Sequence, residues 1–183
     1  MVDDVVRALG YATLGSRLKR IGERLQVQTL DLARTLAEEA TAVDLPVPYN
    51  PVLAALDRNG PLSIGEIAQA LGQSQPGVTR MVNGMKAAGL VAARPAEDDR
   101  RISTIYLTPK GMALVAQLKR TLWPAAALAV EDACAGLEGP FLDQLAQLED
   151  ALSKTPLAQR LPDRPMPDWD AFVSSKGQQK EEK

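Results

Sequence analysis

The sequence contains no histidine and a single cysteine among its 183 residues. Without histidine the chain cannot form the Ser-His-Asp and Cys-His arrangements of many hydrolases, nor a histidine-containing zinc site. One cysteine excludes both an intramolecular disulfide and a metal site made only of thiolates. The adjacent carboxylates Glu38–Glu39 and Asp98–Asp99 stand in no recognisable catalytic motif. We therefore expect no enzymatic activity, no metal and no other cofactor.

Long hydrophobic runs and a positively charged leader are missing as well. No apolar run approaches the roughly 18 residues that suggest a membrane span. Asp3 and Asp4 stand where a secretory signal would carry positive charge. We therefore expect a cytoplasmic protein with no membrane partner. Hydrophobic residues make up 45% of the chain, which is enough for one folded domain with helical arms.

The first 43 residues have the periodicity of a helix. Apolar residues recur there at spacings of mostly three and four, which predicts one long helix or two helices broken near Gln26 to Gln28. Pro46 and Pro48 then end the helical pattern. The apolar stripe consists of Val5, Val6, Leu9, Leu14, Leu18, Ile21, Leu25, Leu32 and Leu36.

A short helix and a helix-turn-helix are predicted next. Asn50 is placed to cap a short helix that starts at Pro51 and stops at Asn59–Gly60. Ser63 and Glu66 have the spacing of a capping box, and the helix that they open ends at Gly72. Ser74 can cap a second helix with Gly89 as its stop. Two helices separated by three residues are typical of a helix-turn-helix. Their predicted inward side chains are Ile64, Ile67, Ala68, Leu71, Val78, Met81, Val82 and Met85.

The sequence after Gly89 changes from a helical to an extended pattern. Two short segments with strand-forming residues, 90–94 and 102–107, flank a polar turn, which predicts a β-hairpin. A hairpin directly after a helix-turn-helix makes a winged helix. Thr108–Pro109 opens a further helix. A kink or boundary is expected at Pro124, and Gly139–Pro140 begins a last helix.

The net charge of the chain is −2, but one segment of it is basic. Residues 62–110 carry 6 basic and 4 acidic side chains, and three of the acids are Glu97, Asp98 and Asp99 at the hairpin tip. The rest of this segment's surface carries four basic residues against Glu66 alone. A local basic face on an acidic protein favours DNA binding. The four basic residues are Arg80, Lys86, Arg94 and Lys110.

Residues 62–111 resemble the winged-helix core of the MarR family of bacterial transcriptional regulators. The most specific element is the wing pattern D-x-R followed after five residues by L-T. A T-R pair and a G-L pair precede it in the family's order. The matching residues are Asp99, Arg101, Leu107 and Thr108 in the wing, and Thr79, Arg80, Gly89 and Leu90 in the preceding helix.

The resemblance implies a mainly α fold with a small β-hairpin wing, in which N- and C-terminal dimerisation helices flank a winged helix-turn-helix core. It implies a homodimer located at the nucleoid. The expected organisation is an N-terminal dimerisation region (1–44), a DNA-binding domain (45–110, with recognition helix 74–88 and wing 90–107), C-terminal dimerisation helices (109–154) and a tail (155–183).

The implied function is transcriptional regulation, with repression favoured, by binding a double-stranded operator with an inverted repeat. The second helix of such a motif enters the major groove, and the wing reaches the minor groove. Arg101 would enter that groove with Asp99 orienting it, and Arg100 would contact phosphate. The predicted contacts on the recognition helix are Ser74, Gln75, Gly77, Thr79, Arg80, Asn83 and Lys86.

Two alternatives stay open for these residues. Family members often bind small aromatic or phenolic ligands, and Tyr11, Arg17 and Arg20 could line such a site, but a solvated helix face is the favoured interpretation of these side chains. The fold could also serve as a protein-interaction module without sequence-specific DNA binding. The acidic chain as a whole favours that alternative slightly, and the Asp99–Arg101 pattern disfavours it.

Overall fold

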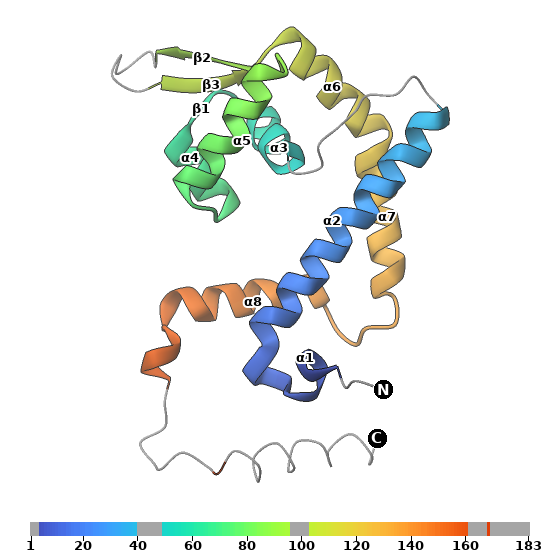
Figure 1. Cartoon of the computed structure of the whole chain (residues 1–183), viewed down its shortest axis with the longest axis vertical. Coiled ribbons are helices and arrows are strands. Elements are labelled where there is room, and N and C mark those ends of the chain that lie inside the picture. The colour runs from blue at the N-terminus through green and yellow to red at the C-terminus, as the bar shows by residue number, and fades with distance from the viewer. Residues whose placement is uncertain (1–3, 40–48, 96–102, 161–167, 169–183) are drawn as a thin grey trace. The chain divides into compact units, whose positions relative to one another are not determined.

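The computed structural model describes residues 4–39, 49–95, 103–160 and 168 of the chain (Figure 1). The chain divides into two compact units. One consists of Arg24–Val130, and the other of Met1–Glu23 together with Glu131–Lys183. Among the described helices, none combines the length and the apolar character needed to cross a membrane.

The unit Arg24–Val130 contains a winged helix-turn-helix, which confirms the predicted fold class. Three helices lie against a three-stranded antiparallel sheet with strand order β1-β3-β2, and α6 follows the sheet (Figure 1). The elements are α3 (Asn50–Asn59), β1 (Leu62–Ser63), α4 (Ile64–Leu71), α5 (Gln75–Ala87), β2 (Val91–Pro95), β3 (Ser103–Leu107) and α6 (Pro109–Arg120).

One hydrophobic core joins these elements. Every buried hydrophobic residue of the described chain lies between Val52 and Leu122. Most of the predicted inward residues of α4 and α5 belong to this core, and Leu32 and Leu36 of the N-terminal helix α2 (Leu14–Glu39) pack against it. Burial of this apolar surface fixes α5 on the body of the unit. The core includes Val52, Leu53, Leu56, Ile67, Ala68, Val78, Val82, Met85, Leu90, Val91, Ile105, Leu114, Val115, Leu118 and Leu122.

Both boundaries of α4, the end of α5 and the start of α6 follow from local capping, as the sequence predicts. The Ser63 amide donates to Glu66 Oε2 over 2.7 Å, and the Glu66 amide donates to Ser63 Oγ over 3.2 Å, which completes the capping box. Gly72 ends α4 with a left-handed φ of 59°. Gly89, with a φ of 70°, follows the end of α5. Thr108 caps α6 by accepting from the Gly111 amide.

The predicted hairpin is confirmed, and a third strand adds to it. Val91 pairs with Leu107 and Pro95 pairs with Ser103 across β2 and β3. The strand β1 pairs with the other side of β3, so that Leu62 lies opposite Ile105. The strand β1 is not predictable from the sequence, because two residues directly before a helix cap carry no alternating pattern.

Asn50 does not cap α3, contrary to the prediction. The N-cap position belongs to Tyr49, whose backbone is already helical, and no side chain makes a capping bond there. Asn50 is the first helical residue, and its buried Oδ1 has no hydrogen-bond partner. The helix therefore begins one residue earlier than Pro51, while its end at Asn59 is as predicted.

The N-terminal helix is broken near its start rather than in its middle. The chain forms α1 (Val5–Ala8), a 3₁₀ turn η1 (Gly10–Thr13) and then α2 (Leu14–Glu39). Of the two alternatives, the long helix is observed across Gln26 to Gln28 and the break there is not, because glutamine is a good helix former and α2 runs through this stretch. Gly10, the first residue of η1, has a φ of 55°, which the interior of an α-helix does not accommodate.

The C-terminal helices are α7 (Leu122–Cys134), α8 (Phe141–Lys154) and the 3₁₀ turn η3 (Leu157–Gln159). The boundary between α6 and α7 lies at Thr121 rather than at Pro124. A proline ring clashes with the carbonyl group four residues earlier, here that of Arg120, so that the helix must end there. Pro124 itself lies in the first turn of α7, where its missing N–H costs little.

Candidate nucleic-acid interface

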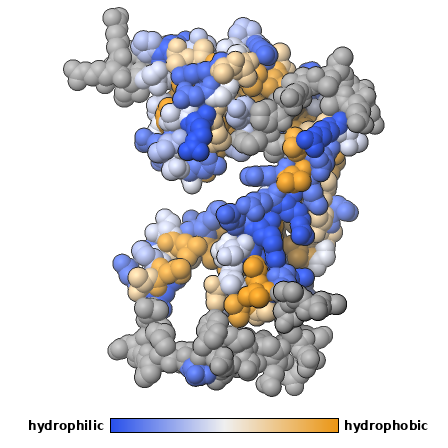
Figure 2. Space-filling view, viewed as in Figure 1, coloured by the Kyte–Doolittle hydropathy of each residue, from blue (hydrophilic) through white to orange (hydrophobic). Residues whose placement is uncertain are grey.

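One side of α5 is free of core contacts and carries the predicted DNA-binding residues. Val78, Val82 and Met85 are buried on the other side of the helix. In the space-filling view, hydrophilic surface covers much of α5 (Figure 2). The helix contains two basic residues and no acidic one, so this surface is positive. Ser74, Gln75, Thr79, Arg80, Asn83 and Lys86 are exposed, and Gly77 is half-buried.

The first turn of α5 has an unusual cap. Ser74 occupies the N-cap position, but its hydroxyl makes no capping hydrogen bond, contrary to the predicted role. A Cβ atom on Gly77 would lie 3.3 Å from Ser74 Oγ, so the hydroxyl lies over Gly77. Glycine at this position therefore gives Ser74 Oγ room beside the backbone of α5.

Two polar side chains of α5 also contact the protein. Thr79 Oγ1 donates to the Gln75 carbonyl over 2.8 Å, so its proton is directed to its own helix. A Cβ atom on Gly65 would lie 3.4 Å from Gln75 Nε2, which places this amide beside the first turn of α4. These contacts restrict the directions in which Gln75 and Thr79 point.

The hairpin extends the basic surface beyond α5. Because Ile105 is buried and strand neighbours alternate, Tyr106 and Thr104 lie on the opposite, outer face of β3. Arg94 stacks on this face, with its Cζ 5.4 Å from the centre of the Tyr106 ring. The predicted wing residues Asp99, Arg100 and Arg101 lie outside the described residues.

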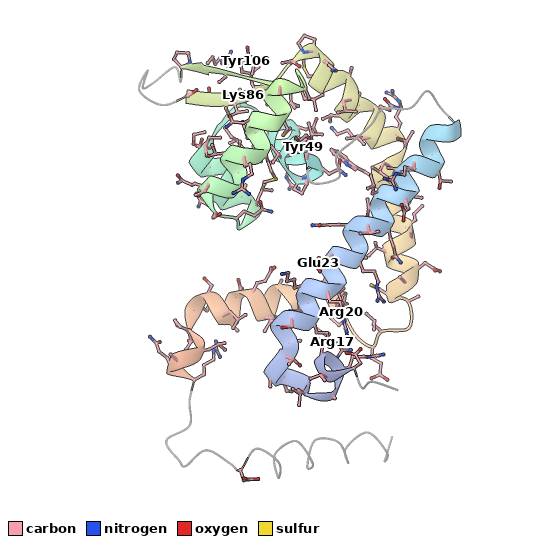
Figure 3. The ribbon with its side chains drawn as sticks, in the orientation of Figure 1. Arg17, Arg20, Glu23, Tyr49, Lys86 and Tyr106 are labelled. Atoms are coloured by element: carbon pink, nitrogen blue, oxygen red, sulfur yellow. The ribbon has the colours of Figure 1, made fainter. Side chains whose placement is uncertain are left out.

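Tyr49 packs against α5 and was not among the residues predicted to matter for the site. The residue precedes α3, and its phenol lies against Gly84 of α5 (Figure 3). A Cβ atom at Gly84 would overlap the Tyr49 hydroxyl. A glycine in the middle of an otherwise regular helix is the signal that could have indicated a close contact.

Lys110 was predicted to contribute to the exposed basic surface, but its ammonium group is hydrogen-bonded within the protein. Its Nζ donates to the Ala88 carbonyl over 2.8 Å. The charge therefore lies at the C-terminal end of α5, where the helix dipole favours a cation.

The predicted ligand residues lie on η1 and the first turns of α2. Arg17 and Arg20 come from α2 (Figure 3), and Tyr11 of η1 is 86% exposed. Arg20 Nη1 lies 2.9 Å from Asp4 Oδ1, and this hydrogen bond holds the pKa of Asp4 below its ordinary value. Among the described residues, no hydrogen bond or ion pair joins Tyr11, Arg17 and Arg20 to one another.

Comparison with known proteins finds similarity in the winged-helix segment. Residues 43–102 match the model of the MarR family. The HTH-type transcriptional repressor IacR of Pseudomonas putida is 36% identical over 70 residues, which cover 38% of this chain and 42% of that protein. The chain thus matches less than half the length of this relative.

Two solved structures share the fold over most of the chain. A MarR family transcriptional regulator from Silicibacter pomeroyi is 27% identical with a TM-score of 0.54, over 82% of this chain and 93% of that one. A mutant of MarR from E. coli in complex with operator DNA is 19% identical with a TM-score of 0.60, over 83% of this chain and 98% of that one. The wing motif, the family model and the shared fold agree that the winged-helix segment of this chain is similar to the MarR family of transcriptional regulators.

Proposed function

We infer that this chain is a dimeric transcriptional repressor that binds an inverted-repeat DNA operator. The observation that carries this inference is the exposed side of α5, which presents polar and basic side chains and no acidic one from a helix-turn-helix frame. Such a helix fits the major groove, where side chains can contact base edges.

The chemistry of each exposed side chain assigns it a contact. Gln75 and Asn83 have amides that can pair with adenine, while Arg80 can pair with guanine or a phosphate. Lys86, in the last turn, is suited to a phosphate. Ser74, Gly77 and Thr79 allow close approach of the first turns to the DNA backbone. In the wing, Arg101 enters the minor groove with Asp99 orienting it, and Arg100 contacts phosphate.

The second compact unit supports dimerisation, because its described residues have no core of their own. Both α1 and α8 lack buried residues. In the space-filling view, apolar surface is visible on α8 (Figure 2). Large exposed apolar surfaces of this kind mark protein interfaces. A second copy of the chain would cover them and would place two recognition helices on one duplex. The exposed apolar residues of this unit include Val5, Leu18, Ile21, Leu137, Phe141, Leu142, Leu152 and Leu157.

A small aromatic or phenolic ligand would relieve repression by favouring a dimer that does not match the operator spacing. At Tyr11, Arg17 and Arg20, an anionic ligand would have to replace Asp4 as the partner of Arg20. The test is a titration with small aromatic carboxylates, in which a binder must both raise the melting temperature and lower the operator affinity.

Selection of bound duplexes from a random DNA pool tests the proposed function. We expect an enriched inverted repeat with half-sites about 10 bp apart. The affinity for the selected duplex should fall steeply as salt rises, because the dimer would neutralise roughly 6–10 phosphates. No enrichment, together with an affinity that does not change with salt, would contradict the proposal and favour a protein-interaction module instead.

A further inference from the structure

Two sets of hydrogen bonds satisfy the backbone at the C-terminal end of α5. The first set joins residues close to Gly89 in the sequence. The Leu90 amide donates to the Met85 carbonyl, and the Gly89 amide donates to the Lys86 carbonyl, each over 2.9 Å. This is the Schellman arrangement, which Gly89 permits through its positive φ. It leaves the carbonyl groups of Ala88, Gly89 and Leu90 to find donors elsewhere.

The first turn of α6 supplies those donors from the other side of the hairpin. Lys110 Nζ donates to the Ala88 carbonyl over 2.8 Å. Thr108 Oγ1 donates to the Gly89 carbonyl over 2.7 Å, and the Thr108 amide donates to the Leu90 carbonyl over 3.0 Å. Three consecutive carbonyl groups at the end of α5 are therefore satisfied by residues about 20 positions later.

Gly111 makes this close approach possible. Its backbone is buried, and a Cβ atom at this position would overlap the Leu90 carbonyl oxygen. The Gly111 amide also donates to Thr108 Oγ1 over 3.1 Å. The Thr108 hydroxyl thus caps α6 and holds the end of α5 at once.

We propose that Thr108 and Lys110 are positioning residues for DNA recognition: they fix the direction of α5 by hydrogen bonds to the three carbonyl groups that directly follow its last residue, and they do not contact DNA. This inference rests on the proposed function. Base contacts by Gln75, Arg80 and Asn83 require paired hydrogen bonds of defined geometry, so a small tilt of α5 weakens them. Phosphate contacts by flexible side chains tolerate the same tilt, because they carry no sequence information.

The test compares Lys110→Met with Lys86→Met in binding to the selected operator and to a random duplex of equal length over a range of salt concentrations. For Lys110→Met we expect the operator affinity to fall roughly 3- to 10-fold, with the random-duplex affinity and the salt slope unchanged. For Lys86→Met we expect both affinities to fall and the salt slope to decrease by about 1. Lys110→Arg, which can still donate to the Ala88 carbonyl, should restore operator binding.

Hydrogen exchange provides a readout that needs no DNA. In Lys110→Met the amides of Gly89 and Leu90 should exchange faster than in the wild type, while the amides of α4 serve as an internal reference. Thr108→Ser, which keeps the hydroxyl, should exchange as the wild type does. Faster exchange in Lys110→Met but not in Thr108→Ser would support the proposal that Lys110 fixes the C-terminal end of α5.

Three results would overturn the inference. In the first, Lys110→Met weakens both duplexes alike and lowers the salt slope, which makes Lys110 a phosphate contact. In the second, Lys110→Met binds the operator as well as the wild type does. In the third, the exchange of Gly89 and Leu90 is unchanged. If the wild-type protein itself prefers no duplex, the proposed function fails, whereas the exchange measurement still tests the hold on α5.

Discussion

Gln75 and Lys86 lie at opposite ends of α5 and differ in their ability to distinguish one DNA base from another. Gln75 offers an amide that can donate to and accept from one base, and its position beside Gly65 limits where that amide points. Lys86 offers a single charge on a flexible stem, which suits any phosphate. Within one helix, Gln75 therefore contributes mainly to sequence specificity, and Lys86 contributes mainly to affinity for any DNA.

Replacing these two residues should give distinguishable binding profiles. Gln75→Ala is expected to alter the base preference at one operator position, at a cost of about 1–3 kcal/mol for the preferred base. Lys86→Ala is expected to weaken all sequences alike. Binding to a library of single-base operator variants measures both effects. An equal loss for operator and random DNA in Gln75→Ala would rule out its base contact.

Glu66 gives the helix-turn-helix a dependence on pH. The hydrogen bonds from the Ser63 amide and hydroxyl hold the pKa of Glu66 below its ordinary value. A carboxylate with a lowered folded-state pKa contributes stability that is complete above the unfolded value, about 4.3, and is lost as the pH falls through the folded-state value. We expect this contribution to disappear progressively below about pH 4.3, measured by urea unfolding at successive pH values.

The matched control is Glu66→Gln, which keeps a capping box without a titratable group. Its unfolding free energy should depend less on pH in the acid range than that of the wild type. Identical acid profiles for the two proteins would show that the capping box of Glu66 has no part in acid unfolding.

For single residues, the sequence predicts those contacts whose partners lie within a few positions along the chain. The capping box of Ser63, the stop at Gly89 and the cap at Thr108 all involve residues within a few positions of one another. Lys110 was wrongly assigned to the free basic surface, because its partner lies 22 positions earlier and depends on the fold. Ser74 does occupy the predicted N-cap position, but whether its hydroxyl makes the capping bond depends on its rotamer, which a residue pattern does not encode.

The contact between α5 and the start of α3 makes a prediction at the level of elements. Alanine is a better helix former than glycine by up to about 1 kcal/mol, so propensity alone would make Gly84→Ala stabilising. The new Cβ would instead overlap the Tyr49 hydroxyl, so we expect a loss of roughly 1–3 kcal/mol of unfolding free energy. Urea unfolding of the variant measures the sign of the change.

Two further variants test the cause. Gly65→Ala in α4 places its Cβ at an ordinary contact distance of 3.4 Å from Gln75 Nε2, so it should be tolerated. Combining Tyr49→Phe with Gly84→Ala removes the overlapping oxygen and should recover part of the loss, leaving a tight contact of 3.2 Å to the ring carbon. No recovery in the double variant would exclude the Tyr49 hydroxyl as the source of the strain.

The element order is largely predictable from periodicity and turn residues, and the exceptions have physical causes. The helix-turn-helix, the hairpin and the last two helices each carry a local pattern. The strand β1 forms only because β3 lies beside it, so its two residues carry no sequence pattern that predicts a strand. The early break in the N-terminal helix depends on the left-handed backbone of Gly10, whereas the polar Gln26 and Gln28 suggested a break that their helix propensity does not require.

For the molecule as a whole, the exposed apolar residues of α8 predict how the chain assembles. Leu142 is 77% exposed in the single chain, so a charge there should leave its fold intact. In the proposed dimer, the same charge would lie in an apolar interface, which is costly. We expect Leu142→Asp to be monomeric by light scattering and to bind the operator at least about 100-fold more weakly, because a monomer engages one half-site only.

The control is Gln147→Glu, which adds the same charge to an exposed polar position of α8. It should remain dimeric and should bind the operator like the wild type. A dimeric Leu142→Asp protein would mean that α8 does not form the interface.

The hold of α6 on the end of α5 determines where this protein could be cut and recombined. An exchange of residues 74–90 with those of another regulator would move the base-contacting side chains but would separate the carbonyl groups at positions 88–90 from Thr108 and Lys110, the donors with which they pair in this chain. A chimera designed for a new operator should therefore carry the segment from Ser74 through Gly111 as one module, with the hairpin included.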